Sequence, residues 1–373
     1  MFSSLCKAGV SHLFQQAGLV IGEDIIVIDD SFYYDVVVKG SLGLGEAFVA
    51  GKWTTPDLVS TIRKMSDSPL LTRVQYWMGW LYPLQWLKSL LLLVLGQSRE
   101  EAREVGSQHY DLSTAMYENM LGDPMIYSCG YWKGADTLED AQYQKMDLLC
   151  RKLQLKPGQS VLEIGCGWGD FAIYMAKNYA VTVVGLTISE NQRLTAEKRA
   201  RLAGVEDKVV FLLQDYRDHT FKYDRIVSVG MLEHVSSSML STYFQHVHYL
   251  LTDEGLAVIH SITKKQSTNI RDPWISKYIF PNSAIPSNSS WVSALSHVEL
   301  EIEDVQNIGP DYAKTLHAWY DRYTRFCDKV SVENGRMWQF YLNCCEAQFL
   351  SRNLNVWQMV LSKKRLVRYD ASR

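Results

Sequence analysis

The sequence predicts an α/β protein in which a mostly parallel sheet carries helices on both faces, preceded by a smaller, mainly helical domain. Short strand-like runs alternate with helical segments from residue 160 onward, and these runs are nearly continuous in apolar residues. Strands that are covered on both faces lose the apolar–polar alternation of half-exposed strands. A glycine-rich turn directly after the first run indicates a ligand site at the carboxyl edge of this sheet.

The pattern of apolar runs predicts seven strands. They are expected at residues 161–164, 181–185, 209–213, 225–229 and 256–261, and then at 298–307 and 354–361. The last two are expected to form an antiparallel hairpin at the edge of the sheet, separated by an aromatic-rich helical insertion over about residues 313–350. Helices are expected over 171–179 and from the N-cap Ser189 to about Ala203.

The turn after the first strand has glycines at Gly165, Gly167 and Gly169. The dinucleotide fingerprint needs Gly-x-Gly-x-x-Gly and a helix N-terminus facing a pyrophosphate. The Gly-x-Gly-x-Gly spacing instead favours S-adenosylmethionine, which has no phosphate. A glycine-rich turn also occurs where a strand and helix only pack closely, and the loop alone leaves both interpretations open. With the alternating strands and helices around it, the loop predicts a Rossmann-like methyltransferase core.

Composition narrows the class of protein. At 373 residues the chain exceeds one ordinary domain, and we place a boundary near residue 105, giving domains 1–105 and 106–373. The net charge of −3 argues against a nucleic-acid partner. Seven cysteines without a Cys-x-x-Cys pair indicate neither a disulfide framework nor a zinc site. Together with an amino terminus that lacks the features of a secretory signal, this predicts a cytoplasmic protein.

Residues 74–96 form a long apolar segment that three polar or helix-breaking residues interrupt: Pro83, Gln85 and Lys88. A helix that spans a membrane needs about 20 predominantly apolar residues. Trp77, Trp80, Tyr82 and Trp86 are residue types that settle at the membrane–water interface, which favours a membrane-surface element. A hairpin buried in the protein or in a dimer interface is an equal alternative, and a transmembrane span is the third.

An ordered set of short motifs runs nearly the length of the chain. It comprises 40–46 (GSLGLGE), 109–112 (HYDL), 127–133 (YSCGYWK), 186–189 (LTIS), 214–218 (QDYRD), 229–234 (VGMLEH), 272–275 (DPWI) and 341–345 (YLNCC). In this set the chain resembles the cyclopropane-fatty-acyl-phospholipid synthases. The resemblance implies a class I S-adenosylmethionine-dependent methyltransferase fold with a seven-stranded sheet. It also implies transfer of a methylene onto the cis double bond of a phospholipid acyl chain.

The resemblance also implies a catalytic base, a bound bicarbonate ion. The five residues at matching positions are Cys129, Glu233, His260, Ile262 and Tyr312. Methylation of an alkene leaves a carbocation, and a base in a dry site must then remove a proton so that the ring can close. From the residues alone, an acid that caps the next helix is the slightly favoured interpretation of Glu233, and the resemblance reverses that preference. Cys129 on its own could be a small buried side chain.

The cofactor residues likewise come from matching positions and from the acid that precedes the glycine loop. They are Tyr127, Ser128, Glu163, Gly165, Gly167, Thr187, Gln192, Asp215 and Tyr216. Among them, Thr187 and Gln192 are expected at the ribose, and Asp215 with Tyr216 near the adenine. Neutral groups at the ribose are cheaper to bury than the carboxylate that many methyltransferases place there.

Several alternatives stay open. Relatives with this fold methylate small amines, others form a methyl or methylene branch, and a silent lipid-binding protein could keep the fold. The histidines 234, 246 and 248 are a weak metal hypothesis, because His-x-His on a helix points its rings apart. Cys345 is interpreted as a core residue. The resemblance finally suggests a homodimer that meets its lipid as a peripheral membrane protein.

Overall fold

The structure is a computed structural model, and it describes residues 2–71, 114–265, 272–281, 283–326, 331–364, 368–371 and 373. These residues form two compact units. The helical unit holds the described residues within 2–71, 272–281 and 312–354, which exclude 327–330. The sheet unit holds the remainder. The apolar segment 74–96 and the expected boundary near residue 105 lie outside the described residues.

The sheet unit is built on seven strands in the order β5-β4-β3-β6-β7-β9-β8. The strands are β3 (Ser160–Ile164), β4 (Thr182–Thr187), β5 (Val209–Leu213), β6 (Tyr223–Val229), β7 (Leu251–Lys264), β8 (Glu301–Asn307) and β9 (Leu354–Ser362). The first five pair in parallel, and β8 runs antiparallel to β9. The predicted α/β fold class, seven-stranded sheet and edge hairpin are therefore confirmed.

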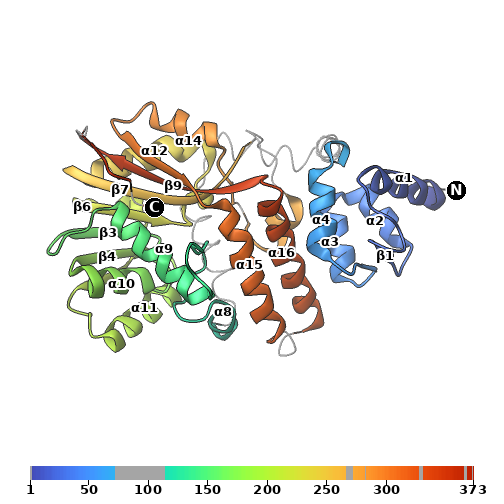
Figure 1. Cartoon of the computed structure of the whole chain (residues 1–373), viewed down its shortest axis with the longest axis horizontal. Helices are drawn as coiled ribbons and strands as arrows, with labels where there is room; N and C mark the ends of the chain where they lie inside the picture. The colour runs from blue at the N-terminus through green and yellow to red at the C-terminus, as the bar shows by residue number, and fades with distance from the viewer. Residues whose placement is uncertain are drawn as a thin grey trace. The chain divides into compact units, whose positions relative to one another are not determined.

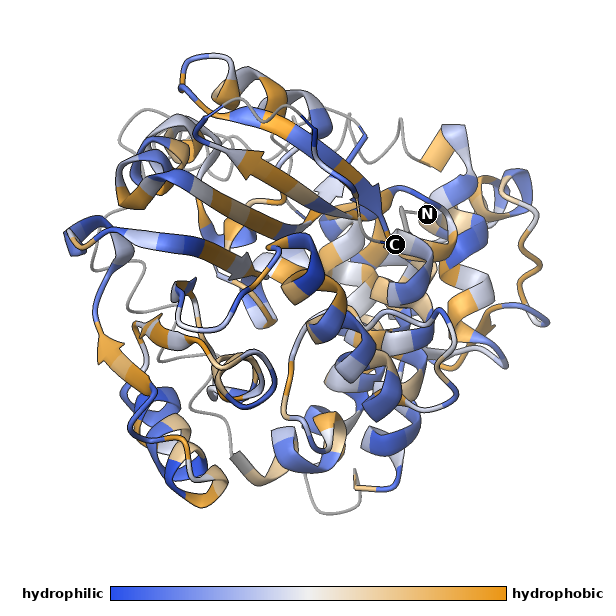
Figure 2. Cartoon of the chain, turned by 60° about the vertical axis from the view of Figure 1, so that its left-hand side comes forward, coloured by the Kyte–Doolittle hydropathy of each residue, from blue (hydrophilic) through white to orange (hydrophobic). Residues whose placement is uncertain are grey.

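Helices cover both faces of this sheet (Figure 1). One face carries α9 (Leu138–Lys152), α10 (Asp170–Tyr179) and α11 (Glu190–Ala203), and the other carries α12 (Leu240–Leu250) and α14 (Asn288–Leu295). Adjacent strand residues face opposite sides, so Val161 and Leu162 on β3 belong to different core clusters. Figure 2 shows the helices banded in orange and blue, as expected for segments with one apolar and one polar face.

Shorter elements complete the sheet unit. They are α8 (Thr114–Leu121) and the single-turn helices η1 (Tyr216–Asp218), η2 (Leu232–His234) and η3 (Ser237–Met239). The predicted N-cap of α11 is confirmed, because the Ser189 hydroxyl accepts a hydrogen bond from the Gln192 N–H. No helix in the described part of the chain is long and apolar enough to cross a membrane.

The helical unit joins segments that are far apart in sequence. Its elements are α1 (Phe2–Gln16), β1 (Ile26–Val27), α2 (Ser31–Lys39), α3 (Ser41–Val49), β2 (Trp53–Thr54), α4 (Leu58–Asp67), α13 (Pro273–Tyr278), α15 (Gly309–Thr324) from Tyr312 onward, and α16 (Val332–Leu350). Helix α16 packs on α3 and α4. The predicted insertion between the last two strands exists as α15 and α16, but it groups with the amino-terminal helices rather than with residues 106–373 as a whole.

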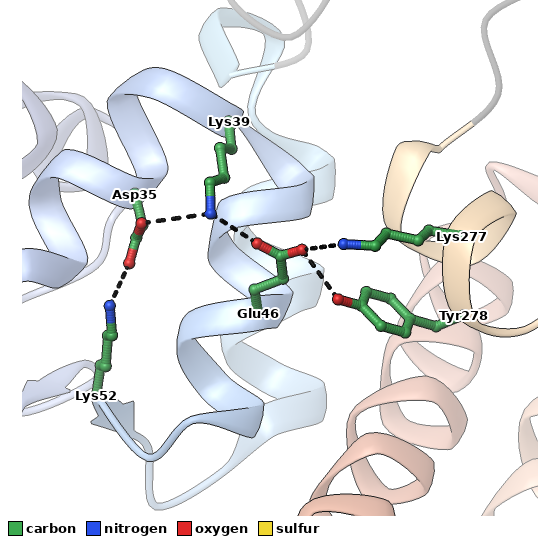
Figure 3. A network of polar contacts seen from close by, with 6 residues as sticks. All are labelled: Asp35, Lys39, Glu46, Lys52, Lys277 and Tyr278. Carbon is green, nitrogen blue, oxygen red and sulfur yellow. Dashed lines mark hydrogen bonds and ion pairs between the residues drawn. The ribbon is translucent and has the colours of Figure 1, made fainter.

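The 40–46 motif has a structural explanation in this unit. A Cβ on Gly45 would lie 2.4 Å from Trp274 Cδ1, so only glycine lets α3 approach α13 this closely. The Glu46 carboxylate accepts hydrogen bonds from Lys39 (2.8 Å), Lys277 (2.7 Å) and the Tyr278 hydroxyl (2.9 Å). Figure 3 shows Glu46 at the centre of this network. The motif therefore fastens α3 to α13.

Replacing Glu46 by glutamine is expected to lower the free energy of unfolding by about 1–2 kcal/mol at neutral pH. Its cationic and hydroxyl donors lower the pKa of Glu46 to about 2, from an ordinary value of 4.5. A depressed carboxyl pKa contributes stability that is fully present above the unfolded value and is lost as the pH falls toward the folded value. The deficit of Glu46→Gln should therefore shrink between about pH 4.5 and pH 2.

Chemical denaturation at several pH values measures this deficit. Asp67→Asn is the matched control, because Asp67 forms a half-exposed pair with Arg63 at 3.6 Å on the same unit. It should change stability by less than about 0.5 kcal/mol. A Glu46→Gln deficit that stays constant down to pH 2 would show that the network does not depress the pKa of Glu46.

Candidate functional site

A pocket opens at the carboxyl ends of β3, β4 and β6 in the sheet unit. The structure brings all nine cofactor candidates into its wall: Tyr127, Ser128, Glu163, Gly165, Gly167, Thr187, Gln192, Asp215 and Tyr216. None of the five proposed bicarbonate ligands lines this pocket. The two predicted groups of residues therefore occupy different positions, and the walls of the pocket match the cofactor group.

The three glycines of the loop have different roles. All adopt positive φ angles, of 82° at Gly165, 52° at Gly167 and 86° at Gly169. A Cβ on Gly167 would meet nothing within 4 Å, and this residue borders the pocket. A Cβ on Gly169 would lie 2.7 Å from Ala196 Cβ and from Phe211 Cζ. Gly167 thus leaves space beside the pocket, whereas Gly169 permits close packing of the loop on its neighbours.

Thr187 and Gln192 form a buried polar pair in the pocket wall. The Thr187 hydroxyl, at the end of β4, donates to Gln192 Oε1 at 2.8 Å. Gln192 lies in the first turn of α11, whose start is fixed by the Ser189 cap. The pair offers neutral hydrogen-bonding groups at the place where the sequence predicts ribose recognition.

Asp215 and Tyr216 follow β5, and their neighbours fix them. The Asp215 carboxylate caps η1 by accepting the Arg217 N–H, and it also forms an ion pair with the Arg217 guanidinium at 2.6 Å. The Tyr216 ring packs edge-on against Tyr243. Burial raises the pKa of the Tyr216 hydroxyl to about 12, which keeps it neutral.

Glu163 is the acid at the end of β3, and its carboxylate is 3% exposed. Burial raises its pKa to about 8. Its Oε2 atom is buried and has no hydrogen-bond partner among the described residues. Leaving a buried acceptor unpaired costs free energy, and such an atom is therefore a mark of a missing ligand.

Among the wall residues that sequence reasoning missed, Lys145 on α9 is a buried charged group. It is 1% exposed, it lines the pocket, and its Nζ donates to the Ser128 hydroxyl at 2.8 Å. A signal was available, because Lys145 is four residues from both Ala141 and Leu149, on the apolar stripe of a helix. A lysine in such a stripe is rarely buried without a partner.

Glu233 and Ile262 meet at the ends of neighbouring strands. Glu233 in η2 follows β6, and its Oε1 accepts the Ile262 N–H of β7 at 2.6 Å. Burial raises the pKa of Glu233 to about 7. Its Oε2 atom is buried without a hydrogen-bond partner in the described part of the chain. Glu233 lies inside η2, whose N-cap residue Met231 forms no side-chain cap hydrogen bond.

His260 lies two residues before Ile262 on the same strand, so both side chains face the same side of the sheet. Burial lowers the pKa of His260 well below its ordinary value, and the ring is neutral. Its Nδ1 lies 3.4 Å from Gln358 Nε2 on β9. If that amide donates a hydrogen bond to Nδ1, the ring proton is on Nε2, and the Nε2–H can donate a hydrogen bond to an anion.

Cys129 and Tyr312 complete the predicted set from different places. The buried Cys129 thiol donates to the carbonyl of Gly130 at 3.2 Å and faces that of Ile308 at 3.8 Å. Tyr312 belongs to the helical unit, where its ring packs on Trp319 and Phe349. The structure therefore joins Glu233 and Ile262 by a hydrogen bond, and it does not join Tyr312 to them within one unit.

Two other hypotheses are addressed by the side-chain chemistry. Burial of the Cys345 thiol raises its pKa to about 12, which argues against a nucleophile, while the residue as a whole is only partly buried. Among the described residues, no group of three or more histidine, cysteine or acidic side chains could hold a metal ion.

Comparison with known proteins identifies the family. Residues 97–359 match the family model described as mycolic acid cyclopropane synthetase. The chain is 41% identical over 361 residues to the cyclopropane-fatty-acyl-phospholipid synthase of Escherichia coli (strain K12), covering 95% of this chain and 92% of that one. It is 32% identical to the tuberculostearic acid methyltransferase UfaA1 of Mycobacterium tuberculosis, covering 87% and 79%.

A solved structure supports the same assignment. The mycolic acid cyclopropane synthase CmaA1, in complex with SAH and CTAB, superposes with a TM-score of 0.65 at 29% identity, covering 69% of this chain and 97% of that one. The family model spans well over half of the chain, and the relatives extend the match into the helical unit. The chain belongs to the mycolic acid cyclopropane synthetase family.

Proposed function

We propose that this protein transfers a methylene from S-adenosylmethionine onto the cis double bond of an unsaturated phospholipid acyl chain, forming a cyclopropane ring. The observation that carries the proposal is the 41% identity to a cyclopropane-fatty-acyl-phospholipid synthase over 92% of that enzyme's length. A match of this extent includes both units of the chain, and not only the methyltransferase core that many enzymes share.

The pocket fits the proposed cofactor. It has an open glycine turn at Gly167, a neutral polar pair at Thr187 and Gln192, and an unpaired buried acceptor on Glu163. S-adenosylmethionine bound there supplies an electrophilic methyl group. The remaining task of the protein is to orient the alkene, exclude water and remove a proton from the added methyl group.

The proton acceptor is proposed to be a bicarbonate held by Cys129, Glu233, His260, Ile262 and Tyr312. The orphaned Glu233 Oε2 supports this, because a protonated oxyanion can donate a hydrogen bond to it. The neutral His260 ring supports it as well, since a neutral imidazole still offers one N–H to an anion. In this arrangement Glu233 orients the ion and does not itself remove the proton.

The substrate also determines where the enzyme works. Because an acyl chain resides in a bilayer, we propose that the protein associates peripherally with the membrane. The resemblance further leads us to propose that it is cytoplasmic and acts as a homodimer. The alternative product is a methyl or methylene branch, which the likeness to UfaA1 favours. N-methylation of a small amine is disfavoured, because an amine needs no bound ion as its base.

Mass spectrometry of lipids from a host that expresses the chain tests the proposal. The expected result is a gain of one CH2 group on unsaturated acyl chains, with loss of the double bond. A methylene branch gives the same mass gain but keeps an alkene, and ozonolysis distinguishes the two. Unchanged lipids together with a methylated amine in the extract would overturn the proposal in favour of N-methylation.

A further inference from the structure

Lys145 is a buried lysine for which the described residues supply no salt bridge, and burial lowers its pKa to about 7. The side chain comes from α9, enters the wall of the cofactor pocket, and forms no salt bridge with a described residue. Its Nζ gives one hydrogen bond, to the Ser128 hydroxyl at 2.8 Å, and an ammonium has three to give. Burying a charge without a partner is costly.

Helix α9 itself provides the comparison. Lys152, two turns further along, is equally buried at 0% exposed, and it forms an ion pair with Asp304 at 2.6 Å. At Lys152, then, the fold provides a carboxylate within ion-pair distance, whereas at Lys145 the nearest described hydrogen-bond partner is a hydroxyl beside the pocket. A carboxylate in the pocket would make the two positions equivalent.

Glu163 presents the complementary situation in the wall of the same pocket. Its carboxylate comes from β3, it also forms no salt bridge with a described residue, and its Oε2 has no hydrogen-bond partner there. Both side chains line the same pocket, and their electrostatic interaction acts on both pKa values. The pocket thus carries one basic and one acidic group, both buried and both incompletely paired.

We propose that Lys145, with Ser128, binds the carboxylate of the methionyl part of the cofactor, while Glu163 binds its ammonium group. An α-amino acid end is a zwitterion, and it is the part of S-adenosylmethionine whose two charges match this pair. The inference rests on the proposed position of S-adenosylmethionine in this pocket. It assigns to Lys145 a direct role in binding.

A purely structural role is the competing explanation. The Lys145–Ser128 bond, the Gln142 Nε2 bond to the Ser128 carbonyl at 2.9 Å and the Tyr131 N–H bond to the Ala141 carbonyl at 2.8 Å all fasten residues 128–131 to α9. If Lys145 only fastens this segment, its loss weakens every ligand of the pocket by the same factor. If it binds a carboxylate, its loss weakens only ligands that have one.

Calorimetric titration with two ligands separates these explanations. The ligands are S-adenosylhomocysteine and its decarboxylated analogue, which keeps the adenosine, the sulfur and the ammonium. The unmodified protein should prefer S-adenosylhomocysteine by about 10- to 100-fold, as expected for one buried charge-assisted contact. In Lys145→Met this preference should fall to within about two-fold, with little change in affinity for the analogue.

Lys152→Met is the control, because it removes a buried lysine from the same helix outside the pocket, and Asp304 keeps its ion pair with Arg373. It should preserve the full preference for S-adenosylhomocysteine. If Lys145→Met lowers the affinity for both ligands by the same factor, the proposed binding of the carboxylate by Lys145 is wrong. The proposed position of the cofactor in the pocket would not be affected by that result. Absence of S-adenosylhomocysteine binding to the unmodified protein would instead overturn the proposed position of the cofactor.

Discussion

Glu233→Gln is expected to lower turnover by about 10²- to 10⁴-fold while cofactor affinity stays within about two-fold. The amide can still accept the Ile262 N–H through its oxygen, so the local hydrogen bond that holds η2 to β7 survives. Its NH2 group replaces the orphaned Oε2, and it can no longer accept a proton from a bound oxyanion. The base would then be misoriented although the cofactor is still held.

Loss of folding does not explain such a result. Burial raises the pKa of Glu233 to about 7. The ionised carboxylate is thus disfavoured in the folded protein, and its cost to stability grows as the pH rises from the unfolded value toward 7. An amide has no such cost, so Glu233→Gln should unfold at an unchanged or higher temperature at neutral pH. Thermal unfolding measures this directly.

Glu163→Gln is the control with the opposite pattern. Glu163 belongs to the pocket wall, so its substitution should lower the affinity for S-adenosylhomocysteine. It should also raise the KM for the cofactor, with a smaller effect on kcat. Steady-state kinetics and calorimetry on both variants give the comparison. If Glu233→Gln loses affinity and turnover by the same factor, Glu233 binds the cofactor, and the bicarbonate role is wrong.

The sheet could be predicted because burial on both faces leaves a signal in each strand. Residues 209–213 were predicted as a strand and form β5 with the same bounds. The position of the pocket follows from topology as well, since carboxyl ends of parallel strands meet at one edge, whereas most of its individual residues were named from the resemblance. What the pattern does not give is the partner of a side chain. Lys145 in an apolar stripe is recognisable, but its distance from Glu163 depends on how α9 packs against the sheet.

The helical unit shows a second limit. Aromatic residues at 313–350 predict an apolar helical insertion, and α15 and α16 are found there. The sequence pattern of these two helices does not show which other segments pack against their apolar faces. Phe340 on α16 packs on Phe48 and Trp274, which are remote in sequence. In the sequence the 40–46 motif indicates only a resemblance, because its physical reason, the close approach of α3 to α13 at Gly45, depends on the three-dimensional structure.

Gly169→Ala is expected to lower the free energy of unfolding by about 2–4 kcal/mol. Two costs add at this position. The φ angle of 86° is one that alanine adopts only with strain, of about 1 kcal/mol. The new Cβ would also lie 2.7 Å from Ala196 Cβ, which is fixed to its backbone, and 2.7 Å from Cζ of Phe211, whose ring is buried in the core. The loop, α11 and β5 must therefore move apart, which overpacking studies place at about 1–3 kcal/mol.

Gly204→Ala separates the two costs. Gly204 is the C-cap of α11, has a φ angle of 67°, and a Cβ there would meet nothing within 4 Å. The free energy of unfolding of Gly204→Ala should fall only by the backbone strain of about 1 kcal/mol. The difference between the two variants then measures the cost of overpacking at Gly169. Urea denaturation of both variants gives the two values. Equal losses would mean that the sheet unit absorbs the Gly169 methyl group without cost, and that the third glycine of the loop is required for its backbone angle alone.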